Sequence, residues 1–221
     1  MEPQGTGAAA GGAGALRVGD AIGYGWRAFK ANPGPLVIVA LVVLVLSGLV
    51  SGAGNVVSDN SVGLGIAFQV AGWLVSILLS LGMIRIALKV TRGEAADVAD
   101  LFKGDQFGPY LGASIVFGLL VAVGLVLCIV PGIIVAVIFG FFGYVILERG
   151  ASVGEGFSGS SDITKGQRGT VFLLGLTLIG LNILGAIACG LGLLVTYPIS
   201  IVAGGYAYRV LSGQPVAPVP E

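Results

Sequence analysis

The chain has 221 residues, of which 56% are hydrophobic and only 10% are charged, and its formal net charge is zero. Soluble domains carry about 25% charged residues, so this composition excludes an ordinary soluble enzyme. The neutral charge offers no basic patch for nucleic acid, and the absence of histidine removes the commonest general base and metal ligand.

The two ends of the chain differ in composition from the region between them. Residues 1–15 are rich in Gly and Ala and predict a flexible tail, without the basic and apolar segments of a cleavable signal peptide. Residues 213–221 are rich in Pro, which cannot continue a helix, and predict a cytoplasmic tail. Residues 16–212 are expected to form one transmembrane domain.

Apolar stretches of roughly the length needed to cross a bilayer, about 20 residues, recur along this domain. They cover residues 35–54, 63–88, 111–130, 132–147, 170–189 and 191–211. The third and fourth stretches meet at Val130-Pro131-Gly132, and the fifth and sixth meet at Cys189-Gly190. The pattern predicts an all-α polytopic membrane bundle of six transmembrane helices in three hairpins.

The basic residues predict how these hairpins are oriented. Lys and Arg occur only before the first stretch, from the end of the second to the start of the third, between the fourth and fifth, and at the end of the sixth. Cytoplasmic loops collect positive charge, so both termini are predicted to be cytoplasmic in the inner membrane of a bacterium. The eleven residues are Arg17, Arg27, Lys30, Arg85, Lys89, Arg92, Lys103, Arg149, Lys165, Arg168 and Arg209.

A short segment before each hairpin indicates an internal repeat. The sequence from Val18 aligns without a gap on the sequence from Val153, and a middle copy around residues 101–103 fits more loosely. In the first copy Ile22, Trp26 and Phe29 share one helical face, which predicts a short amphipathic helix at the membrane surface. Such a helix can be an elbow that sets the angle of the hairpin, or it can sense lipid or dock a partner.

A few polar residues are candidates for contacts rather than for catalysis. Trp26, Phe29, Arg85, Lys165 and Arg168 are candidate interfacial contacts to lipid or to a partner. No catalytic, cofactor-binding or metal site is predicted, because the spans carry no His, Asp or Glu in mid-membrane.

Other side chains within the spans suggest packing roles. Gln69 and Asn182 are candidate intramembrane polar residues, and either can bond a neighbouring helix or face a substrate. Small residues spaced four apart indicate close helix packing, and a spare stripe of them would suit self-association. Cys128 and Cys189 lie in apolar runs and are expected to be free and buried.

Several motifs together resemble a large bacterial family. They are Leu101-Phe102-Lys103, Leu127 to Gly132, Glu148-Arg149-Gly150, Thr164-Lys165-Gly166, Gly192 to Pro198 and Tyr206 to Arg209. The chain resembles uncharacterised six-helix integral membrane proteins, actinobacterial ones in particular, related to the membrane domain attached to some glycerophosphodiester phosphodiesterases. The phosphodiesterase chemistry of such proteins belongs to a separate soluble domain, so the resemblance implies no catalytic residue here.

Two functions from different classes remain open from the sequence. One is a non-enzymatic membrane module that contacts membrane lipids and supports lipid homeostasis, envelope assembly or a membrane complex. The other is a permease or channel-like component for a lipophilic or small substrate. A cavity shared by Asn182 and Gln69 would favour transport, whereas a closed and dry bundle would favour the module.

Overall fold

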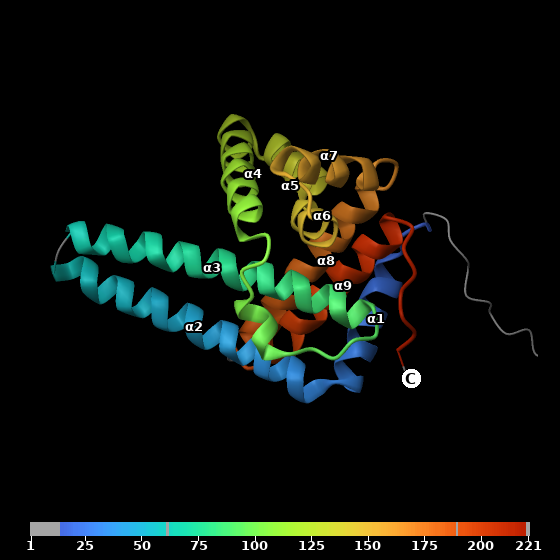
Figure 1. Cartoon of the computed structure of the whole chain (residues 1–221), viewed down its shortest axis with the longest axis horizontal. Helices are drawn as coiled ribbons and strands as arrows, with labels where there is room; N and C mark the ends of the chain where they lie inside the picture. The colour runs from blue at the N-terminus through green and yellow to red at the C-terminus, as the bar shows by residue number, and fades with distance from the viewer. Residues whose placement is uncertain (1–13, 61, 189, 220–221) are drawn as a thin grey trace, which may run out of the picture.

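The computed structural model describes residues 14–60, 62–188 and 190–219, and within these residues it is all-helical, with no strand. This confirms the all-α part of the predicted fold class, and Figure 1 shows the arrangement of the helices. The elements in chain order are α1 (Val18–Ala31), α2 (Pro33–Asn60), α3 (Val62–Thr91), a 3-10 helix η1 (Val98–Phe102), α4 (Phe107–Leu127), α5 (Ile129–Phe139), α6 (Phe142–Arg149), α7 (Val153–Thr164), α8 (Arg168–Ile187) and α9 (Leu193–Leu211).

Among the described residues, five segments are long and apolar enough to cross a membrane, so the chain is a multi-pass membrane protein. The segments are Pro33–Val50, Gly63–Thr91, Phe107–Leu127, Ile129–Arg149 and Arg168–Ile187. The predicted sixth span coincides with α9, which is not among the five. Helix α9 is less apolar than the five segments, and it packs against α1, α2, α3 and α8. A helix surrounded by protein can carry the tyrosines and the arginine that lower its hydropathy.

The fourth predicted span is broken near its middle. Helix α5 ends at Phe139 and α6 begins at Phe142, so backbone groups between them lose their helical partners. Ser160 of α7 satisfies two of these groups, because its Oγ donates to the carbonyl of Ile138 at 2.9 Å and accepts from the N–H of Phe141 at 3.1 Å. An irregular backbone within a span is stable only where the protein supplies such partners.

The turn between α4 and α5 lies three residues earlier than the sequence predicts. Cys128 is the residue between the two helices, and its backbone is extended. Pro131 lies in the first turn of α5, where a backbone N–H would have no helical partner in any case. A Cβ on Gly132 would lie 2.9 Å from the backbone nitrogen of Leu125, so only glycine fits there. Cys128 is free but exposed at this turn, which corrects the expected burial. Cys189 lies outside the described residues.

The core lies at one end of the molecule, where the three hairpins converge. We call this the packed end, and it includes the first half of α2, the second half of α3, α6 and the second half of α9. The opposite ends, the hairpin tips, expose large apolar side chains such as Leu127, Ile187 and Leu191. In Figure 1 the α2–α3 hairpin extends away from the body while α4 points in another direction, so the hairpins splay apart.

The segments before the hairpins differ from one another. The face of α1 that is buried consists of Ala21, Tyr24, Gly25 and Ala28, whereas Trp26 on the predicted apolar face is 47% exposed. The middle segment is only the five-residue 3-10 helix η1 rather than an amphipathic α-helix. The order of a short helix followed by a hairpin recurs, but the internal repeat stays a prediction.

Candidate functional site

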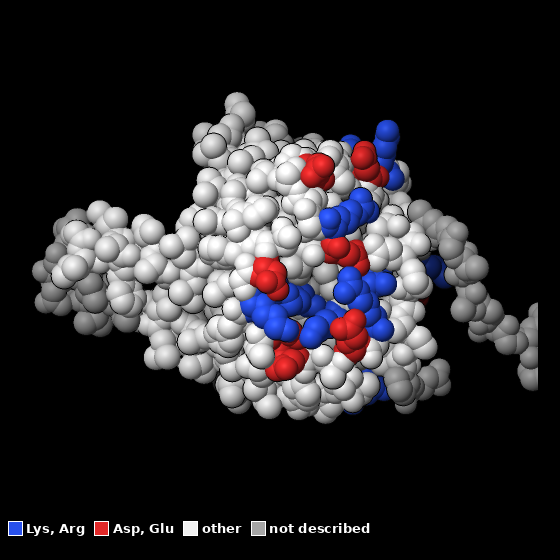
Figure 2. Space-filling model, viewed as in Figure 1, with Lys and Arg blue, Asp and Glu red and all other residues white. Residues whose placement is uncertain are grey.

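Charged side chains gather on one face of the packed end (Figure 2). We call it the charged face, and it is formed by Arg85, Lys89, Arg92, Lys103, Asp105 and Glu148. On the same view, the α2–α3 hairpin shows no charged side chain over its described part. Because this face holds most of the polar chemistry of the fold, it is the first candidate site.

Arg85 of α3 holds the connection between α3 and α4. Its guanidinium donates to the backbone carbonyls of Asp100 at 3.0 Å, Lys103 at 2.8 Å and Asp105 at 3.2 Å. It also lies 3.8 Å from the carboxylate of Asp105, and its side chain is only 11% exposed. Arg85, which was a candidate for contact with lipid or a partner, therefore binds other residues of the chain.

Asp100 is the buried centre of the same connection. Its carboxylate is fully buried and forms ion pairs with the ammonium groups of Lys89 at 2.7 Å and Lys103 at 2.6 Å. Burial opposes the charged form, but the hydrogen bonds from both lysines outweigh it and lower the pKa of Asp100. The carboxylate thus stays ionised, which suits a structural tie and not a proton donor.

Close packing brings η1 against α3. A Cβ added to Gly82 would meet the backbone of Leu101, with the carbonyl oxygen at 2.6 Å. The side chain of Asp97 caps η1 by accepting from the N–H of Ala99 at 2.9 Å. Asp97, Asp100 and Asp105 are therefore used in capping and ion pairing. The described His, Cys, Asp and Glu residues form no group of three that could hold a metal.

Glu148 joins elements that lie far apart in the sequence. Its carboxylate lies 2.8 Å from the guanidinium of Arg92 and 3.5 Å from that of Arg209, and it accepts from the amide of Gln214 at 2.7 Å. It therefore links α3, α6, α9 and the segment after α9. A groove of about 360 Å³ lies beside Glu148. Basic and acidic side chains both line this groove, so their charges balance one another.

The described part of the Pro-rich tail is docked, not free. Arg209 donates from Nε to the carbonyl of Pro215 at 2.8 Å, and the N–H of Ala217 donates to the carbonyl of Thr91 at 2.9 Å. The hydroxyl of Tyr24 donates to the carbonyl of Ala217 at 3.1 Å. The segment runs beside α1 in Figure 1, so it closes the packed end.

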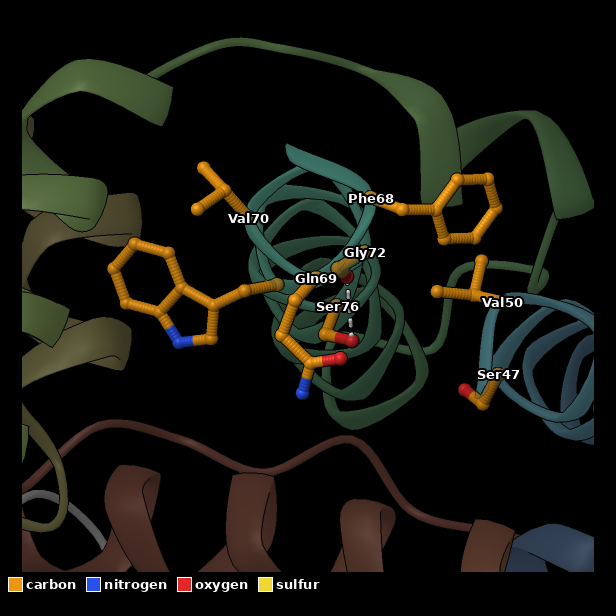
Figure 3. A pocket seen from close by; sticks show the side chains of 8 residues that line it. Ser47, Val50, Phe68, Gln69, Val70, Gly72 and Ser76 are labelled. Carbon is orange, nitrogen blue, oxygen red and sulfur yellow. Dashed lines mark hydrogen bonds between the residues drawn. The ribbon is translucent and has the colours of Figure 1, made fainter. Parts of the chain in front are cut away.

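The two intramembrane polar candidates lie in different places. Gln69 lines a shallow groove between α2 and α3, together with Ser47 and Ser76, as Figure 3 shows. Its side chain is exposed, and Ser76 bonds the carbonyl of Gly72 in its own helix at 3.0 Å. Asn182 of α8 instead donates to the hydroxyl of Ser200 in α9 at 2.7 Å. Asn182 thus pairs two helices, and Gln69 faces outward.

Of the remaining candidates, Trp26, Lys165 and Arg168 are exposed, whereas Phe29 is partly buried against the core. Trp26 stacks on Phe29 with ring centroids 6.2 Å apart, and its indole is 47% exposed. Lys165 follows α7 and Arg168 begins α8, and both side chains are exposed. Within the part of the chain that the structure describes, neither forms an ion pair. Arg168 donates to the hydroxyl of Ser161 at 3.4 Å.

Sequence reasoning missed the two hydroxyls that support the broken helix. Ser160 is described above, and Thr164 also donates to the carbonyl of Ile138, at 3.4 Å. Both are fully buried on one face of α7, four residues apart. That spacing was the only available signal, and it was ambiguous, because hydroxyls in a helix also bond their own backbone, as Thr164 does to Ser160 at 2.9 Å.

The sequence is similar to uncharacterised mycobacterial proteins. It is 26% identical over 226 residues to one from Mycobacterium bovis and to one from Mycobacterium tuberculosis strain CDC 1551, and 25% identical to one from strain H37Rv. Each similarity covers 90% of this chain and 70% of the relative. No family model matches the chain. No solved structure matches it either.

Proposed function

We propose that the protein is a non-enzymatic integral membrane module of the bacterial cytoplasmic membrane. It contacts membrane lipids and supports lipid homeostasis, envelope assembly or a membrane complex, in which self-association can take part. The observation that supports the proposal is that the polar side chains of the fold bind one another and the backbone. Arg85, Asp100, Glu148 and Asn182 are bound to the chain itself, which leaves none of them poised for turnover or for substrate.

A six-span topology with both termini in the cytoplasm belongs to this proposal. Helix α9 serves as the sixth span, because it continues from the α8 tip back to the packed end. The charged face and the exposed Lys165 and Arg168 all lie where spans begin or end at the packed end. Positive charge gathered on one side of a set of spans is retained in the cytoplasm, which supports this orientation.

Labelling of single cysteines tests the topology. The natural Cys128 is exposed at the α4–α5 tip, so it serves as the outer probe in a Cys189→Ala variant. Gly104 lies in the connection before α4 with open space around it, so Gly104→Cys on a cysteine-free background is the inner probe. We expect a membrane-impermeant maleimide to label Cys128 in intact spheroplasts and residue 104 only after permeabilisation. The reverse pattern would overturn the orientation.

Transport in reconstituted vesicles tests the module against its alternative. The alternative is a permease or channel-like component for a lipophilic or small substrate. An open apolar groove between α5 and α8 supports this alternative, and it suits a lipophilic substrate better than a polar one. Coupled transport requires an ionisable group in mid-membrane. We expect no substrate flux driven by a proton gradient. A proton-driven flux that disappears in Asn182→Leu would contradict the module and support the permease.

A further inference from the structure

An apolar groove opens along α8 on the surface of the molecule. It has a volume of about 460 Å³, within the range of roughly 300–1,000 Å³ that is usual for sites of small ligands. Its lining comes from α5, α6, α8 and α9 and is apolar apart from the hydroxyl of Tyr144. Representative lining residues are Ile133, Val137, Phe141, Phe172, Gly175 and Ile179.

One basic residue stands at the packed end of this groove. Arg168, Phe172, Gly175 and Ile179 are spaced by four, three and four residues, so they share one stripe of α8. Three of the four line the groove, and Arg168 is the first residue of the helix. The lining of α8 from Val171 to Ile179 spans about 12 Å at 1.5 Å per residue. The groove therefore has an apolar body and a cationic end.

The contacts of Arg168 place its charge beside the broken helix. Its guanidinium lies 3.4 Å from the hydroxyl of Ser161 in α7. The preceding residue, Ser160, accepts from the N–H of Phe141, which lines the groove. Lys165 lies two residues before the N-cap of α8 and is also exposed. The N-cap side chain, that of Gln167, does not cap the helix, and the uncapped N-terminus adds partial positive charge.

We propose that this groove binds one acyl chain of an anionic glycerophospholipid, with the lipid phosphate held by Arg168 and Lys165. The groove and the lipid are complementary in two ways. The apolar groove suits the acyl chain, and two cations that form no ion pair with the described residues suit the phosphate. The inference deepens the proposed function by naming its lipid class, and it rests on that function for the orientation of the packed end toward the headgroups.

Two pairs of variants test the site in detergent-purified full-length protein. Gly175→Leu fills the groove, and Gly180→Leu is its control, because both glycines lie on α8 with open space around them but only Gly175 lines the groove. Arg168→Gln removes the cation, and Arg27→Gln on α1 is its control, because Arg27 is also exposed. Melting midpoints without lipid verify that each variant is folded.

The probe is dioleoylphosphatidylglycerol, and native mass spectrometry measures its dissociation constant. We expect Gly175→Leu to weaken binding about tenfold or more, since a buried chain contributes strongly per methylene. We expect Arg168→Gln to weaken it about fivefold, the effect of one cation near an anionic headgroup. The two control variants should bind within about twofold of the wild type, a change below the effect of one such cation.

Other outcomes would overturn the proposal. If dioleoylglycerol bound as tightly as dioleoylphosphatidylglycerol, the phosphate would have no role. If inorganic phosphate bound as tightly, the acyl chain would have none. A wild-type dimer that dissociates in Gly175→Leu would assign the groove to a second copy. Unchanged lipid binding in Gly175→Leu and Arg168→Gln would place the lipid elsewhere. These results leave the cysteine-labelling and flux experiments untouched, so a failure of the lipid site is distinguishable from a failure of the proposed function.

Discussion

The packed end and the hairpin tips follow different physical rules. At the packed end, ion pairs and hydrogen bonds join residues from separate hairpins, as Glu148 does with Arg92 and Arg209. At the tips, the residues next to the turns are apolar and exposed, and Leu127 is 76% exposed. Since lipid is as apolar as leucine, burial of the tips against each other gains little. Polar ties and close packing at one end therefore decide how the hairpins are arranged.

Glycine substitutions should separate the two regions most strongly. Gly82→Val at the packed end would force α3 away from the backbone of Leu101, and we expect a loss of about 3 kcal/mol, the upper part of the range for overpacking. Gly180→Val, in open space toward the tip of α8, should change stability by about 0.5 kcal/mol or less. Melting midpoints of the detergent-solubilised variants measure both effects. Equal losses would mean that the tips are packed too.

The buried carboxylate should come next in size. Asp100→Asn keeps the shape of the side chain but removes the charge that two lysines share, and we expect a loss of about 2 kcal/mol. Asp105→Asn is the matched control, because Asp105 is 80% exposed and its ion pair with Arg85 is long at 3.8 Å. Thermal unfolding at neutral pH compares them. A similar, small effect of both would show that the tie at Asp100 is unimportant.

The same carboxylate predicts a pH dependence. The folded-state pKa of Asp100 is lowered below its usual 3.8, with Lys89 and Lys103 facing the carboxylate, Arg85 bonded to its backbone and Asp97 nearby. Its contribution is thus fully present above pH 3.8 and is lost as the pH falls through the folded-state value. The difference in melting midpoint between wild type and Asp100→Asn should shrink from about pH 6 to about pH 3. A constant difference would contradict this.

The smallest expected effect is that of the polar pair between α8 and α9. Asn182→Leu removes the bond to Ser200 within the spans, where such bonds average about 0.6 kcal/mol. A double-mutant cycle with Ser200→Ala measures the pair itself. Gln69→Leu, whose side chain is exposed between α2 and α3, is the control and should not couple to Ser200. Additive effects of Asn182→Leu and Ser200→Ala would show that the bond contributes nothing.

The sequence by itself determined that the chain is an all-helical, multi-pass membrane protein, and it located most of the spans. These follow from local properties, because about 20 apolar residues must form a helix in lipid and a turn such as the one at Cys128 reverses the chain. The first span starts at Pro33, two residues from the predicted boundary at residue 35. Trp26, Lys165 and Arg168 are exposed, and their contact with lipid or with a partner stays a prediction.

Only the tertiary structure decided which residues meet. The contact of Asp100 with Lys89, the contact of Glu148 with Arg209 and the support of the α5–α6 break by Ser160 join residues distant in sequence. Periodicity cannot predict such pairs, because each side chain has several partners of equal chemistry. The central place of α9 depends in the same way on tertiary packing, because α9 packs against α1, α2, α3 and α8.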